Sequence, residues 1–345
     1  MYVATFLKIS HTASSPTVES LTLKTAAALL LLASLCAGAS ASDYSALMKA
    51  RKFADAEQLA NSRLAQDPDN AEALAAKVSA ILSAGKQERY DEAAKLAERC
   101  VAAHPKVAAC HLALGNALGS KALANGIMSA LGYAGTIRDA FKQAVELDPQ
   151  NMEARLSLMS YYLQAPAIVG GGSGKARTLA TQTAAVNGEA GKLMQARLDA
   201  DAERIGAAEA AVLAMPVSAD EAIADGQRDL LVAIGGAHMK AKRLPEAERV
   251  LREAARRFAD SDGPLYSLAR VQQEQGKHRE AVPLFEQVLA RTPGGAAWYR
   301  LGQSHQALGE KNKAVTAYER ALAMTGLPKV GRTDAEAQLQ VLKQK

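Results

Sequence analysis

The feature that most constrains this chain is a segment that recurs near its C-terminal end. Three stretches align without gaps: KRLPEAERVLREA at 242–254, GKHREAVPLFEQV at 276–288 and GEKNKAVTAYERA at 309–321. The matching residues Ala247, Ala281 and Ala314 are 34 and 33 residues apart. A period of this length is typical of stacked helical units, each too small to bury its apolar face alone. Such a chain grows as an array and needs no central core.

Composition agrees with helices. Hydrophobic residues make up 49% of the chain but aromatic residues only 4%, and alanine, the best helix former, supplies much of the apolar share. A β-rich core would need more branched and aromatic side chains. With 22% charged residues and three cysteines in 345 residues, the chain is neither a disordered segment nor a disulfide scaffold.

The period extends upstream, although less regularly. Expected helix ends carry proline at Asp67-Pro68, His104-Pro105 and Asp148-Pro149, with Asp or Asn nearby in the first and the last. Proline cannot continue a helix, and Asp or Asn caps the next one. Positions equivalent to Ala247 then recur through most of the chain and predict eight units: Ala56, Ala93, Ile137, Ala176, Ala208, Ala247, Ala281 and Ala314.

In this pattern the chain resembles the tetratricopeptide-repeat (TPR) family, whose unit is two antiparallel helices. Glycine stands at the expected crossing of the first helix in Gly115, Gly235 and Gly302, and large residues fill the later place in Phe141, Leu251, Phe285 and Tyr318. A small residue admits the neighbouring helix and the larger one packs beside it. The resemblance implies an all-α solenoid of about eight stacked helix pairs. We expect irregular repeats over 42–227, regular repeats over 228–325 and a capping helix over 326–345.

Two insertions interrupt the repeat, near 118–136 and 164–175, and resemble insertions in uncharacterised exported TPR proteins of Gram-negative bacteria. Both fall at the same turn of adjacent units, so stacking should place them side by side on one edge. They either bind a ligand, as grouped loops often do, or cover an apolar edge. A phosphate-binding loop needs G-x-x-x-x-G-K-[ST], whereas Gly174-Lys175 is preceded at the first position by Val169 and followed by Ala176. Its glycines are expected to allow positive φ angles.

The N-terminal region predicts export. Lys24 precedes a ten-residue apolar run at 26–35, and Ala39-Ser40-Ala41 follows it, which are the parts of a secretory signal. We expect residues 1–41 to be cleaved, leaving 304 residues with a formal charge of +4 and only two cysteines, in the periplasm or outside the cell. The run is too short to span a bilayer.

Cys100 and Cys110 flank an expected turn between antiparallel helices, and an oxidising compartment favours a disulfide between them. Free buried thiols are the alternative. Zinc binding by Cys100, His104, Cys110 and His111 is a third, but the spacing is unusual. The scattered His238, His278 and His305 indicate repeat packing. Seven basic residues between Lys240 and Arg257 form a solvated helix face or a site for an acidic partner: Lys240, Lys242, Arg243, Arg249, Arg252, Arg256 and Arg257.

No catalytic or cofactor motif was found, so the leading hypothesis is an exported, non-catalytic scaffold for a protein or peptide partner. A hydrolase or polymer-processing enzyme with its site at the insertions, or a structural spacer, is the alternative. Nucleic-acid binding is disfavoured by export and modest charge. The family resemblance implies a concave groove lined by the first helices, with these candidate contacts: Asn116, Tyr266, Arg270, Gln273, Tyr299, Gln303 and Gln306.

Overall fold

A computed structural model describes residues 41–324 and 326–344, and this part of the chain contains 17 α-helices and no strand. The prediction of an all-α solenoid is confirmed. The predicted leader, residues 1–41, lies outside the described residues except for Ala41. Within the described ranges, no helix combines the length and apolarity that a membrane crossing requires.

The helices alternate between a first and a second member of each pair, and the eight predicted pairs are all present. The first helices are α2 (Ala41–Lys49), α4 (Ala71–Ser83), α6 (Ala108–Asn125), α8 (Met152–Gln164), α10 (Gly188–Asp201), α12 (Glu221–Lys240), α14 (Asp262–Glu274) and α16 (Gly295–Ala307). The second helices are α3 (Phe53–Gln66), α5 (Tyr90–Ala103), α7 (Ile127–Leu147), α9 (Ser173–Val186), α11 (Ile205–Ala214), α13 (Leu244–Arg257), α15 (His278–Arg291) and α17 (Lys311–Ala323). The capping helix is α18 (Lys329–Gln344), and two short 3₁₀ turns are η1 (Gln87–Arg89) and η2 (Ala167–Val169).

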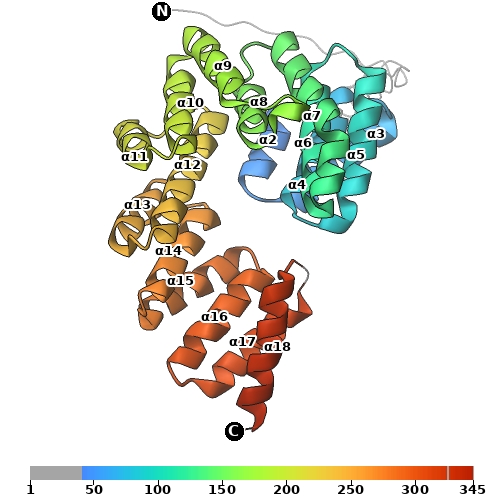
Figure 1. Cartoon of the computed structure of the whole chain (residues 1–345). Helices are drawn as coiled ribbons and strands as arrows, with labels where there is room; N and C mark the ends of the chain where they lie inside the picture. The colour runs from blue at the N-terminus through green and yellow to red at the C-terminus, as the bar shows by residue number, and fades with distance from the viewer. Residues whose placement is uncertain (1–40, 325, 345) are drawn as a thin grey trace, which may run out of the picture.

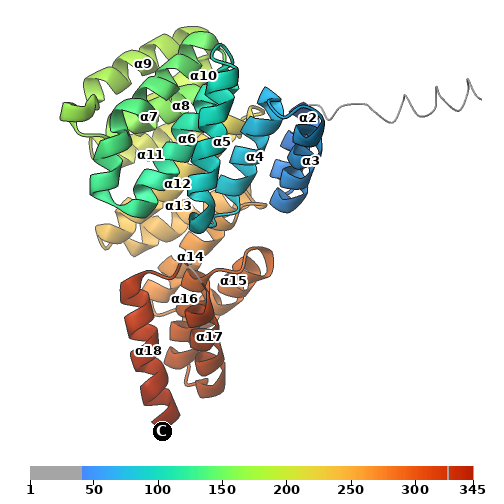
Figure 2. The same cartoon turned by 90° about the vertical axis from the view of Figure 1, so that its right-hand side faces the viewer.

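The pairs stack into a curved array with α18 packed on its C-terminal end (Figures 1 and 2). The curvature brings distant segments together, because Arg51 in the α2–α3 turn reaches the C-terminal repeats. Its Nη2 donates to Thr292 Oγ1 at 2.7 Å and lies 3.2 Å from Asp262 Oδ2. This contact joins residues 241 positions apart in the sequence, so the α2–α3 turn meets the C-terminal repeats.

The glycines at the predicted crossings lie directly under large side chains. A Cβ added to Gly115 would be 2.3 Å from the Phe141 ring, one on Gly235 would be 2.5 Å from Leu251, and one on Gly302 would be 2.9 Å from Tyr318. Real Cβ atoms do not approach so closely, so only glycine fits each crossing. The predicted pairing of small and large residues is confirmed in these three repeats.

Gly115 and Gly119 lie one turn apart on α6 and allow a direct test of this packing. Alanine at Gly119 meets no atom within 4 Å and should stabilise the helix by about 0.5–1 kcal/mol. Alanine at Gly115 gains the same propensity but displaces the buried Phe141 ring, and overpacking costs about 1–3 kcal/mol. Urea unfolding should therefore rank Gly115→Ala below Gly119→Ala by roughly 1–3 kcal/mol. Equal free energies of unfolding would contradict the crossing.

Polar side chains begin the helices after two of the three predicted proline turns, whereas Val107, which precedes α6, supplies no side-chain cap. Asn70 Oδ1 accepts from the amide of Ala73 at 3.0 Å, and Asn151 Oδ1 accepts from the amide of Ala154 at 2.9 Å. Each cap satisfies an amide that has no partner inside the helix. These caps fix where α4 and α8 start and thereby the register of their inner faces.

The two insertions take different forms. The first is not a loop, because residues 118–136 lengthen α6 and α7, which turn sharply at Gly126 (φ +87°). The second is a tight turn containing η2, with positive φ angles at Gly170 and Gly172 as expected. The insertions adjoin: α7 packs on η2, and Arg138 Nη1, just past the first insertion, donates to Val169 O at 3.4 Å. In both views α7, α8 and α9 lie side by side (Figures 1 and 2).

Candidate binding surfaces

Three of the predicted groove residues are covered by the capping helix. The hydroxyl of Tyr299 donates to Asp334 on α18 at 2.7 Å and accepts from Gln303 Nε2 at 2.7 Å. Gln306 Nε2 donates to Gln338, also on α18, at 2.7 Å. Tyr299 and Gln306 are thus engaged by α18, and partner binding at Tyr299, Gln303 and Gln306 stays a prediction. In the last repeat these positions form the joint with α18.

The remaining groove candidates divide between packing and solvent. Gln273 is buried between repeats, where its Nε2 donates to Arg300 O and Ser304 Oγ, both at 2.8 Å, so its amide is engaged within the array. Tyr266 and Arg270 are half-exposed on α14, and the Tyr266 ring packs edge-on against Phe285. Asn116 donates to Glu153 on α8 at 3.2 Å. Of the seven candidates, Asn116 alone contacts the charged surface described next.

On the inner surface, the helices α8, α10 and α12 approach one another closely. Gly226 on α12 lies so close to Leu193 on α10 and Leu156 on α8 that an added Cβ would be 2.7 Å and 3.4 Å from them. This close approach brings α12 into contact with α8, two repeats away. Charged side chains from three repeats therefore gather on one surface, here called the inner charged face: Glu153, Arg197, Glu221, Asp225, Arg228 and Asp229.

The electrostatics of the inner charged face reflect its crowded surroundings. Burial raises the pKa of Glu153, and the nearby Asp225 and Glu221 raise it further, although Asn116 donates to this carboxylate. Burial likewise raises the pKa of Asp225 and lowers that of Arg197. Glu153 and Asp225 are nevertheless exposed at the surface. These groups are open to a ligand and lie beside other carboxylates, and a partner of opposite charge would relieve this repulsion.

Some charges on this face already have partners. Arg228 pairs with Asp225 and donates from Nε to Asp229 at 3.0 Å, and Arg197 Nη2 donates to Ser160 Oγ at 3.2 Å. Four carboxylates oppose two guanidinium groups, so the inner charged face is acidic overall. The sequence did not predict this face, because in the irregular repeats the pattern does not show which positions of each first helix line the groove. The available signal is a charged residue within each first helix, at Glu153, Arg197 and Asp225.

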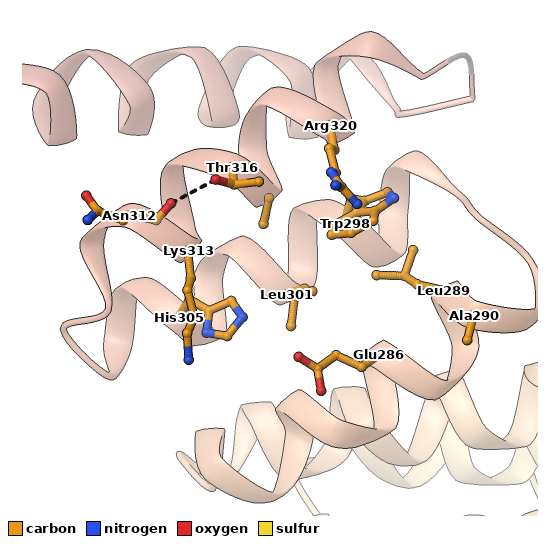
Figure 3. Close-up of a pocket in the computed structure, with 11 residues that line it drawn as sticks. Glu286, Leu289, Ala290, Trp298, Leu301, His305, Asn312, Lys313, Thr316 and Arg320 are labelled. Atoms are coloured by element: carbon orange, nitrogen blue, oxygen red, sulfur yellow. Dashed lines mark hydrogen bonds between the residues drawn. The ribbon is translucent and has the colours of Figure 1, made fainter.

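A hollow with a volume of about 580 Å³ lies between α15, α16 and α17 (Figure 3). The Arg320 guanidinium lies over the Trp298 ring, 4.6 Å from its centroid. The polar groups here are already engaged, since His305 Nδ1 contacts Glu310 Oε2 at 2.5 Å and Thr316 Oγ1 donates to Asn312 O at 3.0 Å. With Leu289 and Leu301 in its wall, the hollow offers mainly an apolar contact.

The comparisons with known proteins agree with this architecture. A family model of the tetratricopeptide repeat matches residues 78–124 and 266–327. The chain contains tetratricopeptide repeats. The array is similar in fold to yeast Tom70, with a TM-score of 0.57 and 12% identity over 84% of this chain and 58% of that one.

Two further solved structures are similar to parts of the TPR array. They are the APC/C hetero-tetramer Cut9–Hcn1 (TM-score 0.49, 15% identity, 84% of this chain and 46% of that one) and YrrB, a TPR protein with an unusual peptide-binding site (0.33, 14%, 71% and 100%). The chain thus spans about half the length of Cut9 and Tom70. No curated protein matches the sequence.

The TPR array joins Cys100 at the end of α5 to Cys110 at the start of α6 by a disulfide, with the Cα atoms 5.2 Å apart. His104 Nε2 lies 2.5 Å from Asp69 O, and His111 Nε2 hydrogen-bonds Pro105 O at 2.8 Å. The four side chains of the zinc alternative are thus engaged elsewhere. Across the described residues, no three His, Cys, Asp or Glu side chains gather as a metal site requires.

The glycine-rich turn of the TPR array uses its own amides. Those of Gly170, Gly171 and Gly172 donate to Ala167 O, Pro166 O and Tyr162 O, at 2.9, 3.1 and 2.7 Å. A phosphate cradle needs free amides pointing at the ligand. The geometry therefore agrees with the sequence argument against nucleotide binding at this turn.

The arginines in the basic segment of α13 form ion pairs. Arg252 pairs with Glu248, Arg256 and Arg257 pair with Glu253, and Arg249 reaches the buried Glu209. His238 and His305, at matching places in α12 and α16, are buried and each contacts a glutamate, Glu209 and Glu310 respectively. Glu209 links its repeat to the next through His238 and Arg249, whereas the other pairs lie within one helix or one repeat, in line with the packing interpretation.

Proposed function

We propose that this TPR protein is an exported, non-catalytic scaffold that binds an extended segment of a protein partner along its inner surface. The observation that carries the proposal is the inner charged face, where exposed carboxylates on α8 and α12 lie close to one another. A structural spacer would have no use for such groups. TPR proteins bind proteins or peptides, and a stacked array suits an extended ligand.

The charge of this face defines the chemistry of the partner. Four carboxylates against two guanidinium groups favour a segment that carries lysine or arginine. Asn116 and Ser160 add polar groups of the kind that hydrogen-bond a peptide backbone. Because Glu153 and Asp225 lie on α8 and α12, the ligand would cross the point where those helices meet. Its charged side chains would then contact separate repeats.

The test compares variants that keep shape and remove charge. Partners captured from envelope extract are identified by mass spectrometry, and a peptide from the cross-linked segment is titrated against the protein. Glu153→Gln with Asp225→Asn should weaken binding at least tenfold, since each lost charge-assisted contact is worth about 1.5–3 kcal/mol. The control, Glu280→Gln with Glu286→Gln, changes two exposed carboxylates on α15. An equal effect of both pairs would refute a specific inner site.

Export is tested separately. N-terminal sequencing of the protein recovered from cells is expected to begin at Ser42, after cleavage behind Ala41. A protein that keeps residues 1–41 and stays in the cytoplasm would overturn export and leave the binding experiment unaffected.

A further inference from the structure

The two insertions carry half of the large apolar side chains that the described residues leave exposed. Ile168 in η2 is 91% exposed, Leu123 near the end of α6 is 79% exposed and Leu131 near the start of α7 is 42% exposed. The contact between Arg138 and Val169 holds the turn at η2 against α7. Leu131 lies two turns along α7 from Arg138, about 10 Å. The surface formed by the α6–α7 turn and η2, which carries these three apolar side chains, is here called the insertion edge.

The two insertions contain no acidic residue, although Asp91 pairs with Lys121 and Asp139 pairs with Arg138 beside them. The chain has 36 Asp and Glu residues, yet residues 99–138 and 154–188 contain none. Lys121, Arg138, Lys175 and Arg177 lie in these stretches. Of the four, Lys175 and Arg177 are exposed and pair with no carboxylate in the described structure. Lys175 Nζ donates to Gly170 O at 2.9 Å. Gly170 follows Ile168 by two residues, so this hydrogen bond holds the ammonium group at the same turn.

The backbone beneath Ile168 is also prepared for an apolar environment. The amides of Gly170, Gly171 and Gly172 donate within the turn, and Val169 O accepts from the Tyr161 hydroxyl at 2.6 Å. Unpaired backbone groups are costly to move out of water. A turn whose backbone groups are satisfied can enter a less polar layer together with its exposed side chain.

From these observations we propose that the insertion edge binds the surface of a membrane rich in anionic phospholipid. Ile168, Leu123 and Leu131 would enter the headgroup region, and Lys175 and Arg177 would contact lipid phosphates. The separation of the apolar side chains favours lipid over protein. A protein partner needs a continuous, well-packed patch, whereas a lipid interface accepts single protruding side chains.

Vesicle flotation tests the proposal with protein lacking residues 1–41, so that the apolar run at 26–35 makes no contribution. The probes are vesicles of phosphatidylcholine with 30 mol% phosphatidylglycerol and vesicles of pure phosphatidylcholine. We expect binding to the anionic vesicles at low salt, at least tenfold weaker binding to the neutral ones, and release by 0.5 M NaCl.

Matched variants separate the insertion edge from general stickiness. Leu123→Ser with Ile168→Ser, and Lys175→Gln with Arg177→Gln, should each weaken binding to anionic vesicles about tenfold or more. Val330→Ser with Val341→Ser removes exposed apolar side chains from α18 and should leave binding unchanged. Circular dichroism confirms that each variant is folded.

Several outcomes would overturn the proposal. They are equal binding to both vesicle types, an equal loss in the α18 control, and no binding of wild-type protein to anionic vesicles. The edge would instead be a protein-docking surface if the serine variant lost a protein partner identified in the capture experiment but bound vesicles normally. This proposal is independent of the inner charged face, whose variants should float with vesicles as the wild type does.

Discussion

Replacing Cys100 and Cys110 together by alanine is expected to lower the free energy of unfolding by about 3 kcal/mol. The disulfide closes a short loop across the α5–α6 turn, and on the chain-entropy estimate such a loop restricts the unfolded chain by about this amount. Both cysteines are fully buried beside Leu74, so alanine keeps the apolar surroundings. Urea unfolding monitored by circular dichroism measures the loss.

The reduced wild-type protein is the control for this change. Dithiothreitol should shift its unfolding midpoint to that of the double variant and leave the double variant unmoved. Because stability in an array is a sum over neighbouring units, the loss should concentrate at the joint between the second and third pairs and broaden the transition. A wild-type midpoint that reductant does not change would show that the thiols are free.

Much of the fold follows from local patterns in the sequence. Helix pairs, their number and the capping helix follow from the period, since each pair buries its apolar face only against its neighbours. The close contacts of Gly235 with Leu251 and of Gly302 with Tyr318 follow because the residues of both pairs are 16 positions apart. Such features depend on residues within one or two units, which a sequence records directly.

The binding surfaces were harder to predict because they depend on curvature summed over many units. Tyr299 and Gln306 match groove positions in a repeat, but the following helix is the cap, whose Asp334 and Gln338 take up their polar atoms. Glu153 and Asp225 come together only because Gly226 lets α12 approach α8. That approach, like the contact of Arg51 with Thr292, links repeats that no local pattern relates.

The buried carboxylate of Glu209 joins three helices, and its removal should cost more than that of any surface charge. Glu209 on α11 accepts from His238 Nε2 on α12 at 2.8 Å and pairs with Arg249 on α13. Burial alone would raise the pKa of Glu209, but the hydrogen bonds from His238 and Arg249 outweigh it and hold the pKa below its usual range. The folded array therefore favours the charged carboxylate.

Glu209→Ala is expected to destabilise the array by about 1–3 kcal/mol, the usual cost of leaving a buried polar group without its hydrogen-bond partner, here His238 Nε2. The matched control is Glu286→Ala, which removes an exposed carboxylate from the middle of α15 and should change stability by less than about 0.5 kcal/mol. Equal midpoints for the two variants in urea would mean that the joint between α11, α12 and α13 is held by apolar contacts alone.

The pH dependence gives a second measurement of the same joint. Because the pKa of Glu209 is lower in the folded than in the unfolded protein, its contribution is complete above the unfolded value of about 4.5 and is lost as the pH falls through the folded value. The difference in unfolding free energy between wild type and Glu209→Gln should therefore shrink as the pH is lowered from 6 toward 3. A difference that is constant over this range would show that the charge of the Glu209 carboxylate contributes nothing to stability. Shape and hydrogen bonding alone would then hold α11 in place.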